Sequence, residues 1–402
     1  MKRSKLKSRR APEVVVIGAG AFGGWTAYHL LELGARVTLV DAWGAGHLRG
    51  TSSDESRVIR CGYGVKAIYS EWAWRALALW KRFEREVRAP ILVRSGVLWL
   101  CAKENDYARA TLATLRGLGA PTERVNAATL ARRYPQFRYE GITFGYLEPK
   151  AGYLRARVAT QAVAEAVKAA GGRVVIAHAE APNAAGEPGG RPYRKLRLSD
   201  GTTIEAQHFV FACGPWLAQL FPALLARRIL VTRQEVFYFG PPPGAVTKFA
   251  PPAMPVWLDP GLHFYGIPSA DARGVKVADD WSGPPFDPTS GERNATAEGL
   301  QAAREYLRLR LPALADAPLL EARVCQYERT PDSHLVIDRH PDFANVWIVG
   351  GGSGHGFKQG PALGEFVARH VLGRRAAPIA NAMRIGASEW PAGTTRPAVG
   401  SL

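Results

Sequence analysis

The residues best equipped for chemistry lie near the C-terminal end of the chain, between Cys325 and Lys358. Val346–Val349 has the composition of a buried strand, and the glycine-rich run Gly350–Gly356 follows it, leading toward a helix expected to begin near Pro361. Helix N-termini, free backbone amides and lysine ammonium groups all attract negative charge. The segment therefore predicts a site for an electron-rich group, although the same pattern also fits an ordinary strand-to-helix turn.

A second glycine motif lies near the N-terminus, directly after the β-branched run 13–17. Gly18 would permit a tight turn, Gly20 would let the backbone approach a pyrophosphate, and Gly23 would let a helix pack closely on the strand. Asp41 ends the next predicted strand, where a carboxylate can accept hydrogen bonds from ribose hydroxyls. Because strand, helix, second strand and acidic residue occur in this order, the motif predicts dinucleotide binding rather than only a glycine-rich turn.

The two motifs together indicate which dinucleotide is bound. Asp41 alone does not separate NAD from FAD, since both contain adenosine and a pyrophosphate. The C-terminal glycines favour FAD, because its isoalloxazine ring becomes anionic on reduction and would be stabilised by a helix N-terminus. We therefore expect one FAD molecule held by segments from both ends of the chain.

The elements that must position these motifs are those of an α/β protein. At 402 residues the chain exceeds the usual size of one domain, so two lobes are expected. The polar segment 182–194 is predicted to form a hairpin-like excursion, and 230–292 a β-rich stretch. Helices are expected at 68–87, twice within 104–134, at 155–170 and at 295–310, and strands at 92–101, 173–178, 194–198 and 208–212.

The composition is that of a soluble globular protein, with 47% hydrophobic and 22% charged residues. The formal charge of +17 raises the question of an anionic partner. Part of this charge belongs to a solvated basic tail, which contains Lys2, Arg3, Lys5, Lys7, Arg9 and Arg10. The other basic residues are dispersed and form no aromatic-basic repeat, which weighs against nucleic-acid binding.

Membrane insertion, export and metal binding find no support in the sequence. The chain has no run of about eighteen apolar residues, so we expect no transmembrane helix. Pro12 and Glu13 follow the basic tail where a secretory signal would need an apolar run. The cysteines lie far apart without a Cys-x-x-Cys pair, which favours a metal-free protein of the reducing cytoplasm. They are Cys61, Cys101, Cys213 and Cys325.

Four sequence blocks give the chain a family resemblance from Val14 to about Gly373. The last block is the most specific, because Cys-x-Tyr, Thr-Pro-Asp-x-His, Ile-Asp-x-His-Pro and Ser-Gly-His-Gly-Phe-Lys occur in order. The chain resembles the D-amino-acid oxidase superfamily of FAD amine oxidoreductases, and within it the sarcosine oxidase and N-methyltryptophan oxidase branch. The blocks are the N-terminal glycine motif, Ser56–Arg60 with Tyr63 and Gly64, Tyr265–Ser269 with Lys276, and Cys325–Lys358.

The resemblance implies an α/β fold with two domains in one monomer. A discontinuous Rossmann-type FAD-binding domain would be joined to a substrate domain built on a mixed or antiparallel sheet. The expected boundaries are 11–95, 150–232 and 320–375 for the FAD-binding domain, 96–149 and 233–319 for the substrate domain, 1–10 for the basic tail and 376–402 for a peripheral segment.

The resemblance also implies roles for individual residues. Cys325, which composition alone would make a small buried apolar residue, matches the cysteine that forms a thioether to the flavin 8-methyl group. Arg60 and Lys358 match the pair that holds the substrate carboxylate, a task suited to a forked guanidinium and an ammonium. Lys276 matches the lysine that activates dioxygen, and Arg57 matches the arginine near the flavin ring.

Two tyrosines, Tyr265 and Tyr327, match residues of the substrate pocket and complete the expected site. As catalytic residues we expect Lys276, Arg57 and Tyr265, and as substrate-binding residues Arg60, Lys358, Tyr265 and Tyr327. The expected cofactor-binding residues are Gly18, Gly20, Phe22, Gly23, Asp41, Ser52, Arg57, Gly214, Cys325, Gly352, Gly354, His355, Gly356 and Lys358.

Two positions depart from the family pattern. Ser53 and Asp280 stand where the family has active-site histidines, which leaves substrate size, substrate charge and reaction pH open. If Asp280 faces the pocket, it would favour a cationic substrate side chain. It could equally face an arginine or solvent.

The activity implied by the resemblance is oxidation of an amino acid, in particular a secondary or N-methyl amine. Hydride would pass to FAD, and dioxygen would be reduced to hydrogen peroxide. The nearest alternative is a flavin dehydrogenase that passes electrons to a quinone or a protein. An alternative of another class is a flavoprotein without amine turnover that binds polyanions through its basic surface.

Overall fold

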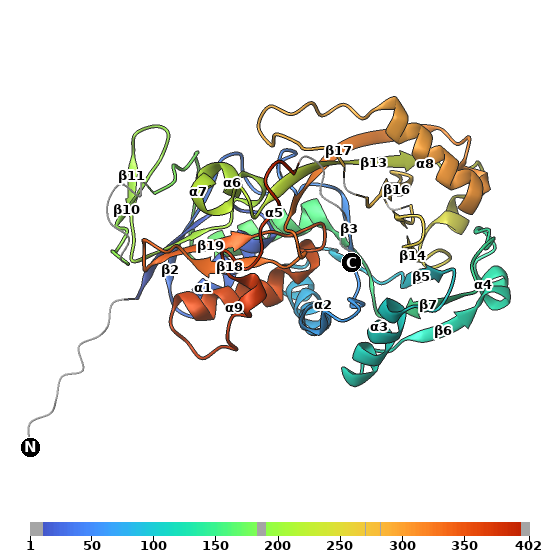
Figure 1. Ribbon diagram of the computed structural model, residues 1–402, viewed down its shortest axis with the longest axis horizontal. Helices are drawn as coiled ribbons and strands as arrows, with labels where there is room; N and C mark the ends of the chain where they lie inside the picture. Colours follow the sequence, from blue (N-terminus) through green and yellow to red (C-terminus); the bar gives the residue numbers. More distant parts are fainter. Residues whose placement is uncertain (1–10, 183–189, 270, 282, 395–402) are drawn as a thin grey trace, which may run out of the picture.

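Two large β-sheets organise the chain, and Figure 1 shows them side by side along its long axis. The computed structural model describes residues 11–182, 190–269, 271–281 and 283–394. The first sheet has the strand order β18-β19-β12-β1-β2-β9, and all its pairs are parallel except β18 with β19. Its strands are β1 (Glu13–Ile17), β2 (Arg36–Asp41), β9 (Arg173–Ile176), β12 (His208–Phe211), β18 (Val336–Arg339) and β19 (Val346–Gly350). This confirms the predicted Rossmann-type sheet.

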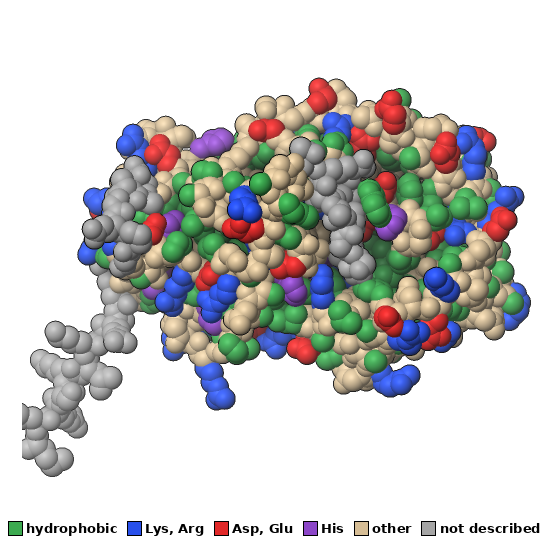
Figure 2. Space-filling model, viewed as in Figure 1, with side chains coloured by type: hydrophobic (Ala, Val, Ile, Leu, Met, Phe, Trp, Pro, Cys, Tyr) green, Lys and Arg blue, Asp and Glu red, His purple; other side chains and the backbone are tan. Residues whose placement is uncertain are grey.

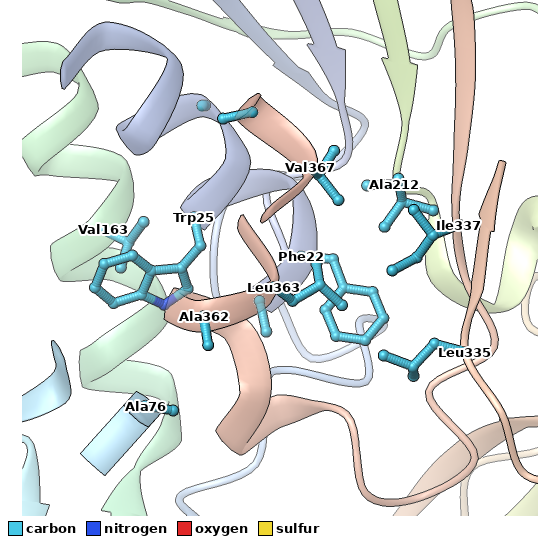
Figure 3. Packing of buried hydrophobic residues seen from close by; sticks show 14 of the residues in the cluster. Phe22, Trp25, Ala76, Val163, Ala212, Leu335, Ile337, Ala362, Leu363 and Val367 are labelled. Atoms are coloured by element: carbon cyan, nitrogen blue, oxygen red, sulfur yellow. The ribbon is translucent and has the colours of Figure 1, made fainter. Parts of the chain in front are cut away.

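Helix α1 packs against two other helices beside this sheet. Phe22 and Trp25 of α1 enter the main core next to Leu363 of α9, as Figure 3 shows. A Cβ atom at Gly364 would lie 2.5 Å from the carbonyl carbon of Trp25, so this glycine allows α9 to approach α1 closely. The helices are α1 (Ala21–Glu32), α5 (Ala156–Ala169) and α9 (Gly360–Val371), with α2 (Ala67–Val87) packed on α9. The helices expected at 68–87, at 155–170 and near Pro361 are thereby confirmed.

The second sheet has the order β17-β13-β16-β15-β14-β5-β7-β6 and is antiparallel except for the pair β14 and β5. This confirms the predicted mixed or antiparallel sheet. Its strands are β5 (Val97–Cys101), β6 (Glu123–Asn126), β7 (Phe144–Glu148), β13 (Leu230–Phe239), β14 (Val256–Asp259), β15 (Phe264–Ile267), β16 (Val275–Asp279) and β17 (Leu319–Arg329). Helix α8 (Ala297–Arg310) buries Tyr306 and Leu307 against it, and α3 (Asp106–Gly117) and α4 (Ala127–Arg133) lie near β5–β7 (Figure 1).

A short three-stranded sheet brings further site residues between the two large sheets. Strand β8 (Gly152–Arg155) lies at its centre and pairs with β3 (Ser56–Ile59) and β4 (Leu92–Val93). The smaller elements elsewhere are the ribbon of β10 (Lys195–Arg197) and β11 (Thr203–Glu205) and the single turns α6 (Leu217–Leu220) and α7 (Pro222–Leu225).

Some expectations concern residues outside the described part of the chain. The basic tail 1–10 and residues 183–189 of the expected excursion at 182–194 fall there. The strand expected at 173–178 ends earlier, at Ile176. No helix in the described ranges has the length and apolar composition needed to cross a bilayer. Nor does any group of His, Cys, Asp and Glu side chains among the described residues have an arrangement that could hold a metal ion.

Candidate active site

A cavity of about 340 Å³ opens at the carboxyl ends of β1 and β2. Gly18 has a φ of +103°, and a Cβ atom there would lie 2.3 Å from the carbonyl oxygen of Ala212, so the turn requires glycine. A Cβ atom at Gly23 would lie 1.8 Å from the carbonyl oxygen of Gly18, which explains how α1 can begin so close to β1. The predicted cofactor-binding residues that line the cavity are Gly18, Gly20, Phe22, Asp41, Ser52, Arg57, Gly214, Gly352, Gly354 and Gly356.

Asp41 lies at the wall of this cavity as the last residue of β2. Its Oδ2 accepts the amide of Ala19 at 2.7 Å, and its Oδ1 accepts the amides of Trp43 and Gly44 at 3.0 and 2.8 Å. A carboxylate offers about four acceptor positions, so about one is left for a ligand hydroxyl. The position is compatible with the predicted hydrogen bond to a ribose, which stays a prediction.

Glu328 on β17 also lines the cavity, and the sequence analysis did not select it. Its side chain is 6% exposed, and its Oε2 has no hydrogen-bond partner among the described residues. Burial raises the pKa of Glu328 to about 7, against the opposing effect of the amides of Gly352 and Gly351. A buried acceptor without a partner at a cavity wall implies a ligand that donates hydrogen bonds. FAD carries such donors, so the residues present fit this cofactor.

Replacing Glu328 with glutamine should stabilise the folded protein at high pH. A carboxyl group whose pKa rises from 4.5 to about 7 on folding contributes stability below pH 4.5 that is lost as the pH rises through 7. This difference corresponds to about 3 kcal/mol. Glutamine stays uncharged, so the unfolding free energy of Glu328→Gln minus that of the wild type should increase by about 2–3 kcal/mol between about pH 5 and 9. Urea unfolding at both pH values measures it.

The control for this experiment is the exposed Glu298 on α8, whose replacement by glutamine should produce no comparable pH-dependent difference. An unfolding free-energy difference for Glu328→Gln that stays constant between the two pH values would show that Glu328 is ionised throughout the range. The carboxylate would then need a cationic partner rather than a hydrogen-bond donor.

A second cavity, of about 530 Å³, adjoins the first, because Gly50, Ser53 and Gln326 line both. Cys325 lines the second cavity, and its Sγ accepts a hydrogen bond from Arg57 Nη2 at 3.1 Å. Arg57 itself lines the first cavity. The thiol predicted to carry the flavin therefore lies where the two cavities meet, beside the guanidinium predicted to lie near the flavin ring.

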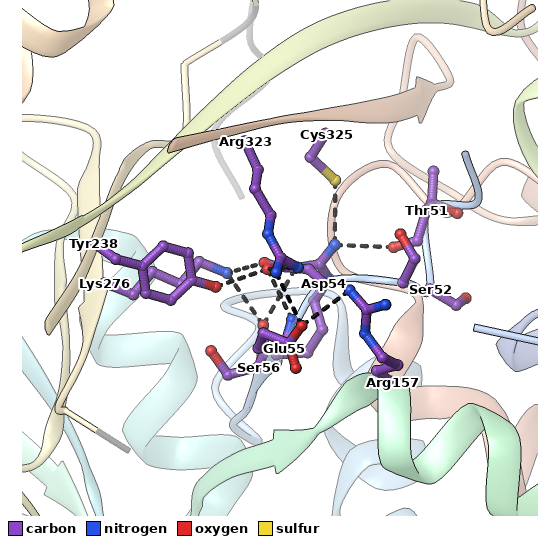
Figure 4. Close-up of polar contacts among 12 residues, drawn as sticks. Thr51, Ser52, Asp54, Glu55, Ser56, Arg157, Tyr238, Lys276, Arg323 and Cys325 are labelled. Atoms are coloured by element: carbon purple, nitrogen blue, oxygen red, sulfur yellow. Dashed lines mark hydrogen bonds and ion pairs between the residues drawn. The ribbon is translucent and has the colours of Figure 1, made fainter. Parts of the chain in front are cut away.

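Asp54 is the centre of a buried polar cluster between the sheets (Figure 4). Its side chain accepts hydrogen bonds from Lys276 Nζ, Arg57 Nη1 and, at 2.7 Å, the hydroxyl group of Tyr238. Lys276 also donates to the carbonyl oxygen of Ser56 at 3.1 Å. Burial alone would raise the pKa of Asp54, but Lys276 and Arg57 hold it far below its ordinary value. A carboxylate that the sequence analysis did not select thus joins two predicted catalytic residues.

The predicted carboxylate-binding pair, Arg60 and Lys358, meets around one aromatic ring. Arg60 Cζ lies 4.4 Å and Lys358 Nζ lies 5.7 Å from the centroid of Tyr63, and both side chains are buried. Burial, together with the neighbouring Arg60, lowers the pKa of Lys358 well below its ordinary value. Within the described residues neither cation donates a hydrogen bond to a carboxylate. Two buried basic side chains without a bonded carboxylate are compatible with the predicted binding of a substrate carboxylate, which stays a prediction.

Glu148 holds the loop that carries Arg60, and it is not among the residues predicted from the sequence. This buried residue of β7 accepts the amides of Cys61 and Gly62 at 2.6 and 3.2 Å, and the indole N–H of Trp99 at 2.9 Å. Arg60 in turn donates to the carbonyl oxygen of Gly62. A residue of the second sheet therefore fixes the loop that follows β3.

Asp280 faces the predicted pocket rather than solvent. The hydroxyl group of Tyr327 donates to Asp280 Oδ1 at 3.2 Å, and Arg329 donates to the Asp280 carbonyl oxygen at 3.2 Å. Burial raises the pKa of Asp280, while Arg329, Arg60 and Lys358 oppose this increase. The departure from the family pattern thus places a carboxyl group within electrostatic range of the predicted carboxylate-binding pair.

Three other predicted positions have different surroundings. The ring of Tyr265 lies next to Lys276, whose Nζ is 5.7 Å from the ring centroid. Ser53, at the other departure from the family pattern, donates to backbone carbonyl groups of its own loop. His355 is not among the residues that line the first cavity, and its Nε2 lies 2.9 Å from the carbonyl oxygen of Ser333.

Comparison of the sequence with known proteins identifies its relatives. Residues 13–370 match the family described as FAD dependent oxidoreductase. The chain is 31% identical over 377 residues to the monomeric sarcosine oxidase of Streptomyces avermitilis, which covers 91% of this chain and 95% of that protein. It is 29% identical over 366 residues to the peroxisomal sarcosine oxidase of Homo sapiens, with coverages of 88% and 90%. It is 27% identical over 373 residues to the N-methyl-L-tryptophan oxidase of Salmonella newport, with coverages of 90% and 95%.

Solved structures share the fold at lower identity. The modified fructosyl peptide oxidase from Aspergillus nidulans superposes with a TM-score of 0.83 at 20% identity, covering 97% of each chain. L-proline dehydrogenase from P. horikoshii superposes with a TM-score of 0.77 at 22% identity, covering 92% of this chain and 96% of that one. One of these is named an oxidase and the other a dehydrogenase, so the shared fold alone does not distinguish the two classes.

Proposed function

Because this chain belongs to the FAD dependent oxidoreductase family, we propose that it oxidises an amino acid at the carbon next to a secondary or N-methyl amine nitrogen. The FAD cofactor, when bound, supplies the acceptor for the hydride and passes the electrons to dioxygen. Relatives named sarcosine oxidase and N-methyl-L-tryptophan oxidase, which align over most of this chain, support an N-methyl amino acid as the substrate class.

The observation that carries the proposal is the pair of buried cations around Tyr63. Arg60 and Lys358 have no carboxylate bonded to them among the described residues, so an anionic substrate group would satisfy both. Tyr327 connects this place to the first cavity, because it lines that cavity and donates to Asp280 near the cations. A substrate held by its carboxylate there would have its amine directed between the tyrosine and the cofactor site.

The residues that would hold FAD come from both ends of the chain. Gly18 and Gly20 at the start of α1 would meet the pyrophosphate, and Asp41 the ribose. Glu328 would accept a hydrogen bond from the cofactor through its unpartnered oxygen. No residue needs to act as a base on the substrate carbon, because an amine that binds deprotonated can lose a hydride directly.

The proposal is tested by anaerobic reduction of the bound flavin with a panel of amines. N-methyl amino acids, cyclic amino acids, primary amino acids and the decarboxylated analogue of each are mixed with the enzyme, and the flavin absorbance is followed. We expect N-methyl or cyclic amino acids to bleach the flavin and the decarboxylated analogues to leave it oxidised. A flavin that no amino acid in the panel reduces would contradict the proposal.

Covalent attachment of FAD through Cys325 is a separate prediction. The thiol lies beside the Arg57 guanidinium, which would stabilise negative charge on sulfur. Thioether formation would replace one C–H bond of the flavin 8-methyl group with a C–S bond, and the two electrons released would reduce the flavin, which dioxygen would reoxidise to give hydrogen peroxide. Acid precipitation of the wild-type protein should therefore leave the yellow colour in the pellet, whereas Cys325→Ser should release all FAD into the supernatant. Cys213→Ser is the matched control and should retain the colour. Complete release of FAD from the wild-type protein would overturn the assignment of Cys325.

The alternative of a polyanion-binding flavoprotein finds little support on the surface. Figure 2 shows Lys and Arg side chains spread over the visible face, with Asp and Glu side chains among them. Many of the exposed arginines are paired, as in Arg109 with Asp106 and Arg124 with Glu104. Where basic residues are paired in this way, the local field that a polyanion would need is weakened.

A further inference from the structure

Asp54 lines the second cavity, but the contacts of its side chain are made to groups of the protein. Its side chain is 4% exposed, and it is the only carboxylate that accepts a hydrogen bond from Lys276 in the described part of the chain. It also bonds to Arg57 and Tyr238, and Arg323 Nη1 lies 3.9 Å away (Figure 4). One carboxylate therefore binds groups from β3, β13 and β16 and neighbours a fourth from β17.

Lys276 depends on this carboxylate for its charge. Its side chain is 1% exposed, and burial lowers its pKa, as does the neighbouring Arg57 guanidinium. Asp54 and, more weakly, the Cys325 thiol act in the opposite direction. The remaining groups that face the ammonium are the Ser56 carbonyl oxygen, the Tyr265 ring, and beyond Asp54 the Tyr238 hydroxyl and the Arg323 guanidinium. Without Asp54 the ammonium would be surrounded by uncharged groups and cations.

We propose that Asp54 is a positioning residue that holds Lys276 in its protonated form between the two sheets and so sets the upper pH limit for reaction of the reduced flavin with dioxygen. The inference rests on the proposed function, in which Lys276 supplies the positive charge for that step. Asp54 does this without touching substrate. If Lys276 lost its proton, the charge of Asp54 would be left buried without its partner, which is costly. The ion pair therefore keeps the proton on the amine of Lys276.

The test measures reoxidation as a function of pH with the FAD-loaded full chain. The flavin is reduced photochemically, so the measurement does not depend on any amine substrate, and the reoxidation rate constant in air-saturated buffer is followed by stopped-flow absorbance. The variants are Asp54→Asn, Asp54→Glu and Lys276→Met. Glu55→Gln is the matched control, since Glu55 pairs with Arg157 and Arg323 but not with Lys276.

In the wild type and in Glu55→Gln the rate constant should fall at high pH with the same midpoint. Asp54→Asn should lower this midpoint by about two pH units or more, the loss expected for a buried pair that is broken on one side. In Asp54→Glu, which keeps a carboxylate, the midpoint should lie close to that of the wild type. The second readout is the 13Cε signal of Lys276 in lysine-labelled protein, whose titration midpoint should move with the rate profile in each variant that keeps Lys276.

The outcomes distinguish a failure of the inference about Asp54 from a failure of the proposed function. If Lys276→Met slows reoxidation but Asp54→Asn leaves both midpoints unchanged, the inference about Asp54 is overturned and the proposed function stands. If Lys276→Met reoxidises at the wild-type rate, Lys276 has no role in the reaction with dioxygen. That part of the proposed function is then wrong, and the inference about Asp54 is overturned with it. If Asp54→Asn does not retain FAD, the 13Cε signal of Lys276 still decides, because it is read without the cofactor: a midpoint equal to that of wild-type protein produced without FAD overturns the inference.

Discussion

Lys276→Met is expected to slow flavin reoxidation in air by about 100- to 1,000-fold while anaerobic reduction by substrate stays near the wild-type rate. Transfer of electrons to dioxygen creates negative charge, and a buried ammonium next to the place of transfer stabilises that charge more in the transition state than in the ground state. Methionine keeps the length of the side chain and removes the charge. Lys276 is 1% exposed, so water cannot replace the lost charge.

Stopped-flow absorbance times the two half-reactions separately. Replacing the exposed Lys103 with methionine is the control, and it should change neither rate. If Lys276→Met slows reduction and leaves reoxidation unchanged, Lys276 serves substrate binding instead. The flavin dehydrogenase that passes electrons to a quinone or a protein would then be the better reading.

Removing the charge of either Arg60 or Lys358, the predicted carboxylate-binding pair, should lower kcat/KM for an amino acid by about tenfold to a hundredfold. Hydrogen bonds to charged groups contribute about 1.5–3 kcal/mol, which converts to this range. Arg60→Met and Lys358→Met keep most of the side-chain volume, so the packing around Tyr63 should be preserved. Steady-state kinetics with the best substrate of the panel measures the loss. Replacing the exposed Lys103 with methionine is the control, and it should leave kcat/KM unchanged.

Lys358 adds a pH dependence to this prediction. Burial and Arg60 lower its pKa well below the ordinary value, so in the free enzyme it loses its proton as the pH rises through that lowered value. The value of kcat/KM for a carboxylate substrate should fall over the same interval, and the fall should be absent in Lys358→Met. Equal turnover of an amino acid and its decarboxylated analogue by the wild type would show that neither cation binds a substrate carboxylate.

The parts of the site that the sequence predicts are those with a local signature. The turn at Gly18 needs a positive φ and has no room for a side chain, so its glycine marks the position directly. The same holds for the strand, turn and helix from Val346 to Val371, where glycines separate two elements of clear periodicity. Local steric requirements of this kind can be predicted from a few neighbouring residues of the sequence.

The acidic residues of the site have no such signature. Asp54 meets Lys276 across 222 positions of sequence and Tyr238 across 184, and Glu148 meets Cys61 across 87. Nothing in the local pattern distinguishes these carboxylates from solvated ones, because their role depends on strand pairings between distant segments. For Glu328 the available signal is its place beside Tyr327 in the most specific block, three residues after the cysteine expected to carry the flavin.

The way the two sheets divide the site has an evolutionary consequence. Among the residues that the structure describes, those lining the first cavity include none from β5, β7, β14, β15 or β16. Substitutions in these strands can therefore alter the shape and charge of the substrate pocket while the surfaces that hold the dinucleotide stay under unchanged selection. Diversification of substrate range can proceed in these five strands, whereas β17 of the same sheet lines the cofactor cavity with Gln326, Tyr327 and Glu328 and stays constrained.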